Sequence, residues 1–157
     1  MTTPLHDDEP DTSPQVVRTL LGQQVPELAG LPLEPLTNTG SDNALYRLGA
    51  DLVVRLPRRP GAARGLEVEL AWLPRLSGLP AGVPSVRHAG APTSRYRYRW
   101  AVLHWLGGTD AWEARDRDWF GPALGHDLAA AVRELRSTPV LDAPVRQLGQ
   151  RGGPLHA

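Results

Sequence analysis

Two short β-type segments joined by a very tight connection restrict the fold of this chain more than any other feature. Residues 44–48 alternate in side-chain character, and residues 52–56 are mostly apolar, as is typical of strands. Only residues 49–51 separate them, so the two strands must be neighbours that run antiparallel. A Pro-bounded apolar segment at 33–37 precedes them. The region therefore predicts a meander of three antiparallel strands.

Three other segments have the spacing of amphipathic helices. The first begins at Ser13-Pro14, with Ser as the N-cap and Pro at the first helical position. The second covers residues 62–76, and Pro74 is expected to perturb its last turn. The third follows Pro122, where apolar residues again recur at helical spacing. These segments predict helices before, within and after the strand-rich region.

Two more strands complete the expected pattern. A short one lies near Val86, and a long one covers residues 96–106, where Gly107-Gly108 ends it. The order of three strands, a helix, two strands and a helix predicts an α+β fold with an antiparallel sheet.

Composition excludes several classes of function. The 157 residues suffice for one domain, and 17 basic residues balance 17 acidic ones, so no global charge attracts nucleic acid or an anionic membrane. Cysteine is absent, which excludes disulfides and thiolate chemistry. Lysine is also absent, which excludes Schiff bases. With scattered histidines, no long apolar run and no signal sequence, we expect no protein metal site, no nucleic-acid or membrane partner, and a cytoplasmic location.

A cluster of small polar residues connects the first two expected strands. It consists of Thr39, Gly40, Ser41, Asp42 and Asn43. Residues of this kind can present backbone N–H groups to a phosphate. The same composition is typical of an ordinary hairpin loop, so the cluster alone leaves both readings open.

A cation and a carboxylate are expected to meet on the sheet. Alternation places Arg55 on the opposite face from its apolar neighbours. Along the helix at 62–76, Glu69 falls among the leucines and Glu67 falls opposite them. A carboxylate that faces a core needs a partner, and Arg55 is the candidate. The alternatives are that Arg55 points to water from an edge strand and that Glu69 reaches water at the margin of the apolar stripe.

Four segments together resemble the aminoglycoside phosphotransferase family of the protein-kinase-like fold. They are residues 40–48 (GSDNALYRL), 52–59 (LVVRLPRR), 69–76 (ELAWLPRL) and 100–108 (WAVLHWLGG). They recur in the order and spacing of the family, and the likeness runs from about Leu20 to the end of the chain.

The resemblance implies a nucleotide-binding N-lobe with a five-stranded antiparallel sheet and one packed helix. We expect this lobe over residues 13–106, preceded by a disordered lead-in at 1–12. Residues 107–157 would form a linker and the first helix of a truncated helical C-lobe.

The resemblance also implies a role for each site residue. Residues 39–43 would form the loop that positions ATP. Arg55 would hold the α- and β-phosphates, where most kinases carry lysine, and Glu69 would orient it. The backbone of His104 and Leu106 would hydrogen-bond the adenine.

The catalytic segment of the family has no counterpart in this sequence. The family uses a His-Gly-Asp segment whose Asp is the base, and an Asn five residues after it together with a later second Asp holds magnesium. The only Asn residues here are Asn38 and Asn43, far upstream. The segment 125–128 (GHDL) has the order scrambled and Val132 at the Asn position, so we interpret it as helix surface. We expect no catalytic and no metal-binding residue, with magnesium entering only with the nucleotide.

Several functions remain open from the sequence. The first is the ATP-binding lobe of a small-molecule phosphotransferase that transfers the γ-phosphate to a hydroxyl. Such a lobe would be inactive alone. The chain would then be a fragment, a protein completed by a second polypeptide, or a naturally short binding protein. The second is a protein-interaction module that self-associates, or an inert fragment, with an apolar patch formed by Trp105, Trp112, Trp119 and Phe120. The third, nucleic-acid binding by residues 95–100, is disfavoured because arginines and aromatics alternate between faces.

Overall fold

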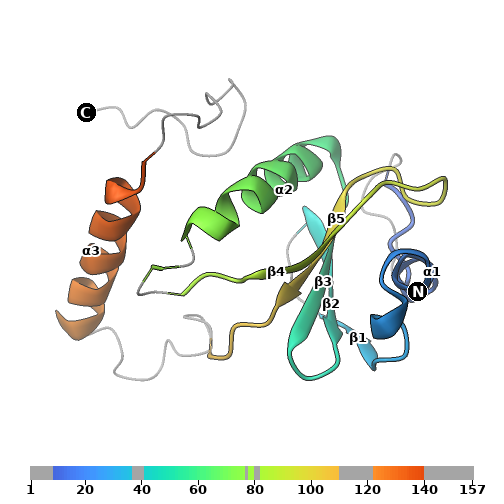
Figure 1. The fold of residues 1–157 in the computed structure, drawn as a ribbon, viewed down its shortest axis with the longest axis horizontal. Coiled ribbons are helices and arrows are strands. Elements are labelled where there is room, and N and C mark those ends of the chain that lie inside the picture. Colours follow the sequence, from blue (N-terminus) through green and yellow to red (C-terminus); the bar gives the residue numbers. More distant parts are fainter. Residues whose placement is uncertain (1–8, 37–40, 77, 80–81, 110–121, 140–157) are drawn as a thin grey trace.

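The computed structural model describes residues 9–36, 41–76, 78–79, 82–109 and 122–139. Figure 1 shows the arrangement of its helices and strands. In chain order the elements are α1 (Pro14–Gln24), η1 (Pro26–Leu28), β1 (Leu33–Pro35), β2 (Asn43–Leu48), β3 (Leu52–Pro57), α2 (Pro60–Trp72), η2 (Leu73–Leu76), β4 (Val86–Gly90), β5 (Trp100–His104) and α3 (Pro122–Ser137).

The strands form one antiparallel sheet in the order β1-β2-β3-β5-β4. This confirms the predicted α+β class and the five-stranded sheet. β3 lies at the centre, where Arg55 is opposite Leu45 of β2 on one side and Ala101 of β5 on the other. A residue at this position is held by neighbours on both sides.

One face of the sheet is covered by α1. Alternate residues of β2 and β3 are buried there, because successive side chains of a strand point to opposite faces. Tyr46 and Val54 pack in one cluster with Leu20 of α1 and with Trp100 of β5. Trp100 and Val54 are fully buried. Burial of side chains of this size stabilises the fold by about 1.5–3 kcal/mol each.

The other face is covered by α2, which lies across the sheet from α1 (Figure 1). Its buried cluster is smaller and consists of Leu66 of α2 with Ala101 and Leu103 of β5. The α-helix ends at Trp72 and continues as the short 3-10 turn η2. Pro74 lacks the N–H that an α-helical bond needs, so the expected perturbation of this helix end is confirmed.

The predicted strand over residues 96–106 is too long at both ends, because β5 covers only Trp100–His104. The larger error is at its beginning. Thr93 satisfies the backbone of Tyr96 locally. The N–H of Thr93 donates to the carbonyl of Tyr96 at 2.8 Å, and the N–H of Tyr96 donates to Oγ1 of Thr93 at 3.1 Å. A backbone that is paired in a local turn cannot join the ladder, whatever the side-chain alternation.

Residues just before α1 pack against the sheet. The Tyr46 hydroxyl donates to the carbonyl of Thr12 at 2.5 Å, and Arg58 lies 3.7 Å from the carboxylate of Glu9. Thr12 is buried. The packed chain therefore begins before Ser13, inside the segment expected to be a disordered lead-in, while residues 1–8 lie outside the described residues.

Gly90 of β4 lies directly beneath the indole ring of Trp100. A Cβ atom at position 90 would be 2.1 Å from Cε2 of Trp100. Real Cβ contacts are never that short, so only glycine allows the ring to lie flat on this strand. Trp100 in turn fills the centre of the α1 face.

α3 differs from the other helices in its exposure. None of its described side chains is buried, and Leu128, Val132 and Leu135 are about half exposed. Figure 1 shows this helix set apart from the sheet. Among the described helices, none has the length and apolar character to cross a membrane.

Candidate functional site

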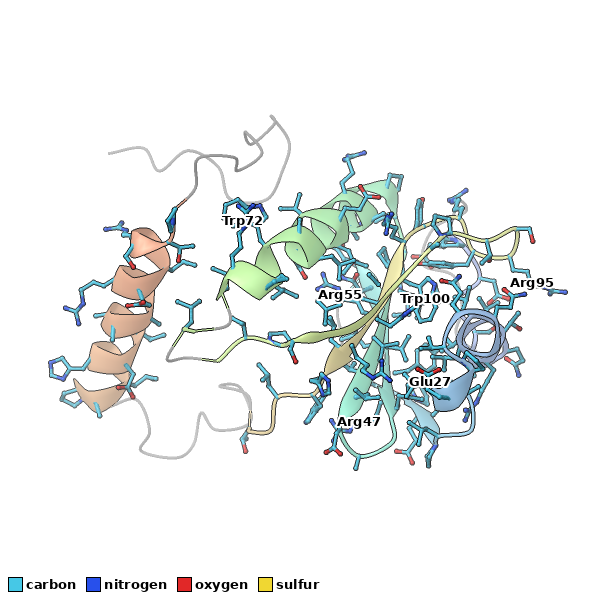
Figure 2. The ribbon with its side chains drawn as sticks, viewed as in Figure 1. Glu27, Arg47, Arg55, Trp72, Arg95 and Trp100 are labelled. Carbon is cyan, nitrogen blue, oxygen red and sulfur yellow. The ribbon has the colours of Figure 1, made fainter. Side chains whose placement is uncertain are left out.

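Arg55 is the charged residue at the centre of the α2 face. β3 places it between the buried residues Val54 and Leu56, whose side chains point to the α1 face. Figure 2 shows Arg55 on the α2 side of the sheet and Trp100 on the opposite side. The Arg55 side chain is 22% exposed. A guanidinium that is largely removed from water needs hydrogen-bond partners to offset its lost hydration.

Glu69 of α2 supplies the first partner. Its Oε2 accepts from Nη1 of Arg55, and its Oε1 accepts from Nη2 at 3.2 Å. Such a bidentate contact fixes the plane of the guanidinium. The side chain of Glu69 is 44% exposed, so water screens the pair and its contribution to stability is modest. Glu67 is exposed, so the helix geometry correctly distinguishes the two carboxylates.

Asn43 supplies a second partner from the beginning of β2. Its Oδ1 accepts from Nε of Arg55 at 3.1 Å. Leu45 is opposite Arg55 and Asn43 is opposite Pro57, which puts Asn43 and Arg55 on the same face as diagonal neighbours. The sequence names Asn43 as a loop residue only. The register of the hairpin at 49–51 was the signal that could have revealed this contact.

The end of the polar loop is fastened to the end of β3. The carbonyl of Asp42 accepts from the N–H of Arg58 at 2.8 Å, and its carboxylate pairs with Arg59. The hydroxyl of Ser41 lies 3.4 Å from the same carboxylate and is exposed. Thr39 and Gly40, which the sequence also assigns to this site, lie outside the described residues. Of these loop residues, Asn43 contacts Arg55, whereas Asp42 contacts Arg58 and Arg59.

The segment after β5 forms the opposite end of the candidate site. The N–H of His104 donates to the carbonyl of Ser85 at 2.9 Å, and the N–H of Trp105 donates to the carbonyl of Asp51 at 2.8 Å. Leu106 is half exposed. The guanidinium of Arg47 lies 4.2 Å from the centre of the Trp105 ring. The N–H groups of His104 and Trp105 are thus held at this end of the sheet, and Leu106 is exposed.

Together these groups form a polar and an apolar end on one face. Arg55 provides a fixed cation whose remaining N–H groups can bind an anion. Leu45 and Val53, on the same face, are only partly buried and can contact a flat ring. The chemistry of these groups, a cation beside partly buried apolar side chains, is compatible with a ligand that has anionic oxygens and an apolar ring.

Acidic and histidine side chains do not gather within the described part of the chain. No group of three or more that could hold a metal ion is found there. His126 and Asp127 are exposed on α3, as expected for helix surface. The two tyrosines with a raised pKa, Tyr46 and Tyr96, belong to the α1 face, where burial disfavours their charged form.

The fold and the ion pair on the α2 face define a protein-kinase-like N-lobe, in which an antiparallel sheet and one helix hold a paired cation. A family model described as the phosphotransferase enzyme family, APH, matches residues 33–155. The chain belongs to this family.

Several solved structures of aminoglycoside phosphotransferases have the same fold as this chain. A GDP complex of wild-type aminoglycoside 2'-phosphotransferase-IIIa is 23% identical over 80% of this chain and 42% of that chain, with a TM-score of 0.70. A ternary complex of APH(2")-IIa with streptomycin and ATP is 18% identical over 82% of this chain and 41% of that chain, with a TM-score of 0.58. The chain thus spans less than half the length of these structures. Among curated sequences, no significant match is found.

Proposed function

We propose that this chain is the nucleotide-binding lobe of a small-molecule phosphotransferase. The observation that carries the proposal is the pairing of Arg55 with Glu69 on the α2 face. In kinase-like phosphotransferases a strand cation paired with a helix carboxylate holds the nucleotide phosphates. Here arginine takes the place of lysine and can grip phosphate through more than one N–H.

In this proposal a nucleoside triphosphate lies along the α2 face. Arg55 binds the α- and β-phosphates, Glu69 orients it, and the loop at 39–43 covers the phosphate chain. The base lies against Leu45 and Val53 and is hydrogen-bonded by the backbone of 104–106. The N–H of His104 already donates to Ser85, so we assign the base to the carbonyl of His104 and the N–H of Leu106.

The resemblance found in the sequence implies that the base is adenine, so we propose ATP as the nucleotide. Similar structures contain GDP in three cases, ATP in one and ADP in one, so guanine is the competing base. Backbone groups alone can serve either purine. The choice between the two is therefore an outcome of the binding experiment.

The reaction of the whole enzyme would be transfer of the γ-phosphoryl group to a hydroxyl of a small molecule. Similar structures contain kanamycin or streptomycin, which suggests an aminoglycoside as the acceptor class. The described residues contribute binding and orientation of the phosphates. The described residues include no cluster of magnesium ligands, and the sequence lacks the catalytic segment of the family, so we expect binding without turnover by this chain.

Calorimetric titration with ATP and with GTP, each with magnesium, tests the proposal. We expect saturable binding of at least one, weakened by about thirtyfold or more in Arg55→Ala, since charged hydrogen bonds to phosphate are lost. Arg64 is exposed on the outer side of α2, so Arg64→Ala is the matched control and should bind as the wild type does. A folded chain that binds neither nucleotide would refute the proposal.

A second candidate, a protein-interaction module, has one observation in its favour. Leu128, Val132 and Leu135 leave an apolar stripe of α3 half exposed. Of the aromatic residues that the sequence suggests for such a patch, Trp105 is exposed and the others lie outside the described residues. Sedimentation over a range of concentrations would distinguish the two, because a self-associating module gains mass with concentration and a nucleotide lobe does not.

A further inference from the structure

The strand cation of this chain has a contact that a lysine could not make. A lysine ammonium sits at the tip of its side chain, whereas arginine carries an additional donor, Nε, one atom nearer the backbone. In this chain Nε donates to Oδ1 of Asn43 at 3.1 Å. Glu69 contacts only the terminal nitrogens, Nη1 and Nη2. The two partners therefore hold different parts of the same guanidinium.

The two contacts together fix the orientation of the cation. Glu69 alone defines the plane of the guanidinium, but its side chain is almost half exposed and belongs to a helix. Asn43, which belongs to the sheet, adds a second restraint on the guanidinium at Nε, the nitrogen nearest the backbone. Each terminal nitrogen keeps one further N–H, and with both partners in place these N–H groups point in a defined direction.

We propose that Asn43 is a positioning residue for the phosphate grip. Its side-chain oxygen holds the guanidinium of Arg55 so that the N–H groups left unused by Glu69 meet the phosphates of the nucleotide. The proposal rests on the nucleotide-binding function proposed above. Asn43 belongs to the beginning of β2 and to the end of the loop, so it also connects the loop to the cation.

The first test needs no nucleotide. The Nε–H of Arg55 is observed by 15N NMR and assigned by its loss in Arg55→Lys. We expect slow exchange of this proton with water in the wild type, exchange about tenfold faster in Asn43→Ala, and slow exchange again in Asn43→Asp, which keeps an oxygen acceptor. Gln23→Ala removes an exposed amide of α1 and should leave the exchange unchanged. Equal exchange in the wild type and Asn43→Ala would overturn the proposal.

The second test separates positioning from general support of the fold. Affinity is measured for the triphosphate and for the corresponding nucleoside, in the wild type, Asn43→Ala, Arg55→Lys and the double variant. We expect Asn43→Ala to weaken the triphosphate by about tenfold and the nucleoside hardly at all. In the Arg55→Lys background the same change should cost less than about twofold, because lysine has no Nε–H donor at that position.

Two outcomes of the binding cycle would overturn the proposal. One is equal weakening of triphosphate and nucleoside, which indicates a structural role for Asn43. The other is an undiminished effect of Asn43→Ala when residue 55 is lysine. If the exchange result holds but the wild type binds no nucleotide, the proposed function fails, and the Asn43 contact is then structural rather than positioning. Thermal unfolding of each variant identifies any that lose affinity by failing to fold.

Discussion

The two faces of the sheet are built from the same strands but differ in how they use them. The α1 face buries a continuous apolar cluster that includes Trp100, Tyr46 and Val54. The α2 face buries only a small cluster around Leu66, and its centre holds a partly exposed guanidinium. Alternation along β3 assigns neighbouring residues to opposite faces, so a single strand supplies both. Burial is thus concentrated on one face, and the other holds a partly exposed ion pair.

The largest expected effect is on the α1 face. Trp100→Ala removes a fully buried indole and leaves a cavity above Gly90, so we expect a loss of about 3–5 kcal/mol in the free energy of unfolding. Chemical denaturation monitored by far-UV circular dichroism measures it. A loss below about 1 kcal/mol would mean that the two faces do not differ in the way described.

Alkaline pH tests the same face by another route. Burial raises the pKa of Tyr96, whose hydroxyl donates to the carbonyl of Pro57 at 2.6 Å. The unfolded chain releases this proton near pH 10, while the folded chain retains it to higher pH. The stability from Tyr96 is therefore complete below about pH 10 and is lost above it as pH rises toward the folded pKa, by up to about 1.4 kcal/mol per pH unit.

The variant Tyr96→Phe isolates this contribution. It should be less stable than the wild type at neutral pH by about 1 kcal/mol, because the buried carbonyl of Pro57 loses its donor. Above about pH 10 the difference should shrink, since phenylalanine has no proton to release. Parallel slopes of stability against pH in the two proteins would contradict the assignment to Tyr96.

On the α2 face we expect the opposite balance between stability and binding. Glu69→Gln removes the charge that pairs with Arg55 but should lower the free energy of unfolding by no more than about 1 kcal/mol, because the pair is partly exposed. Nucleotide affinity should fall severalfold. Glu67→Gln on the exposed side of α2 is the control for both measurements. A large loss of stability with intact affinity would assign Glu69 to the core instead.

The smallest effect is expected on α3. Leu128 is 58% exposed, so Leu128→Ser should change the free energy of unfolding by less than about 0.5 kcal/mol. Thermal unfolding of the two proteins at several concentrations is the measurement. A loss of several degrees in Tm would show that this side chain is covered in solution and would extend the comparison to a third apolar surface.

Local patterns were sufficient to predict the parts of the fold that depend on periodicity. Alternation located β2 and β3, and the angular spacing of a helix distinguished Glu69 from Glu67. The same alternation failed at residues 96–99, because the side chain and backbone of Thr93 pair with Tyr96 and no pattern of hydrophobicity records this. The hydrogen bond from Tyr46 to the backbone of Thr12 could not be predicted either, because an irregular segment has no periodic pattern.

The candidate site was predicted in its residues but only partly in its contacts. The pair formed by Arg55 and Glu69 could be predicted, because alternation along the strand places Arg55 and the angular spacing of the helix places Glu69. The hydrogen bond from Arg55 to Asn43 depends on the register of β2 against β3 and on the length of the arginine side chain. The roles of the site residues in holding a nucleotide stay predictions until binding is measured.

Arginine at position 55 also determines how the charge of the site can be altered. A lysine in that position can be acetylated, and its ammonium can lose its proton when it is desolvated. The chain has no lysine at all, so acetylation is not available at position 55. Amine-directed acylating reagents would therefore find no side-chain amine in this chain. Dicarbonyl reagents that modify guanidinium groups are the covalent probes that fit it.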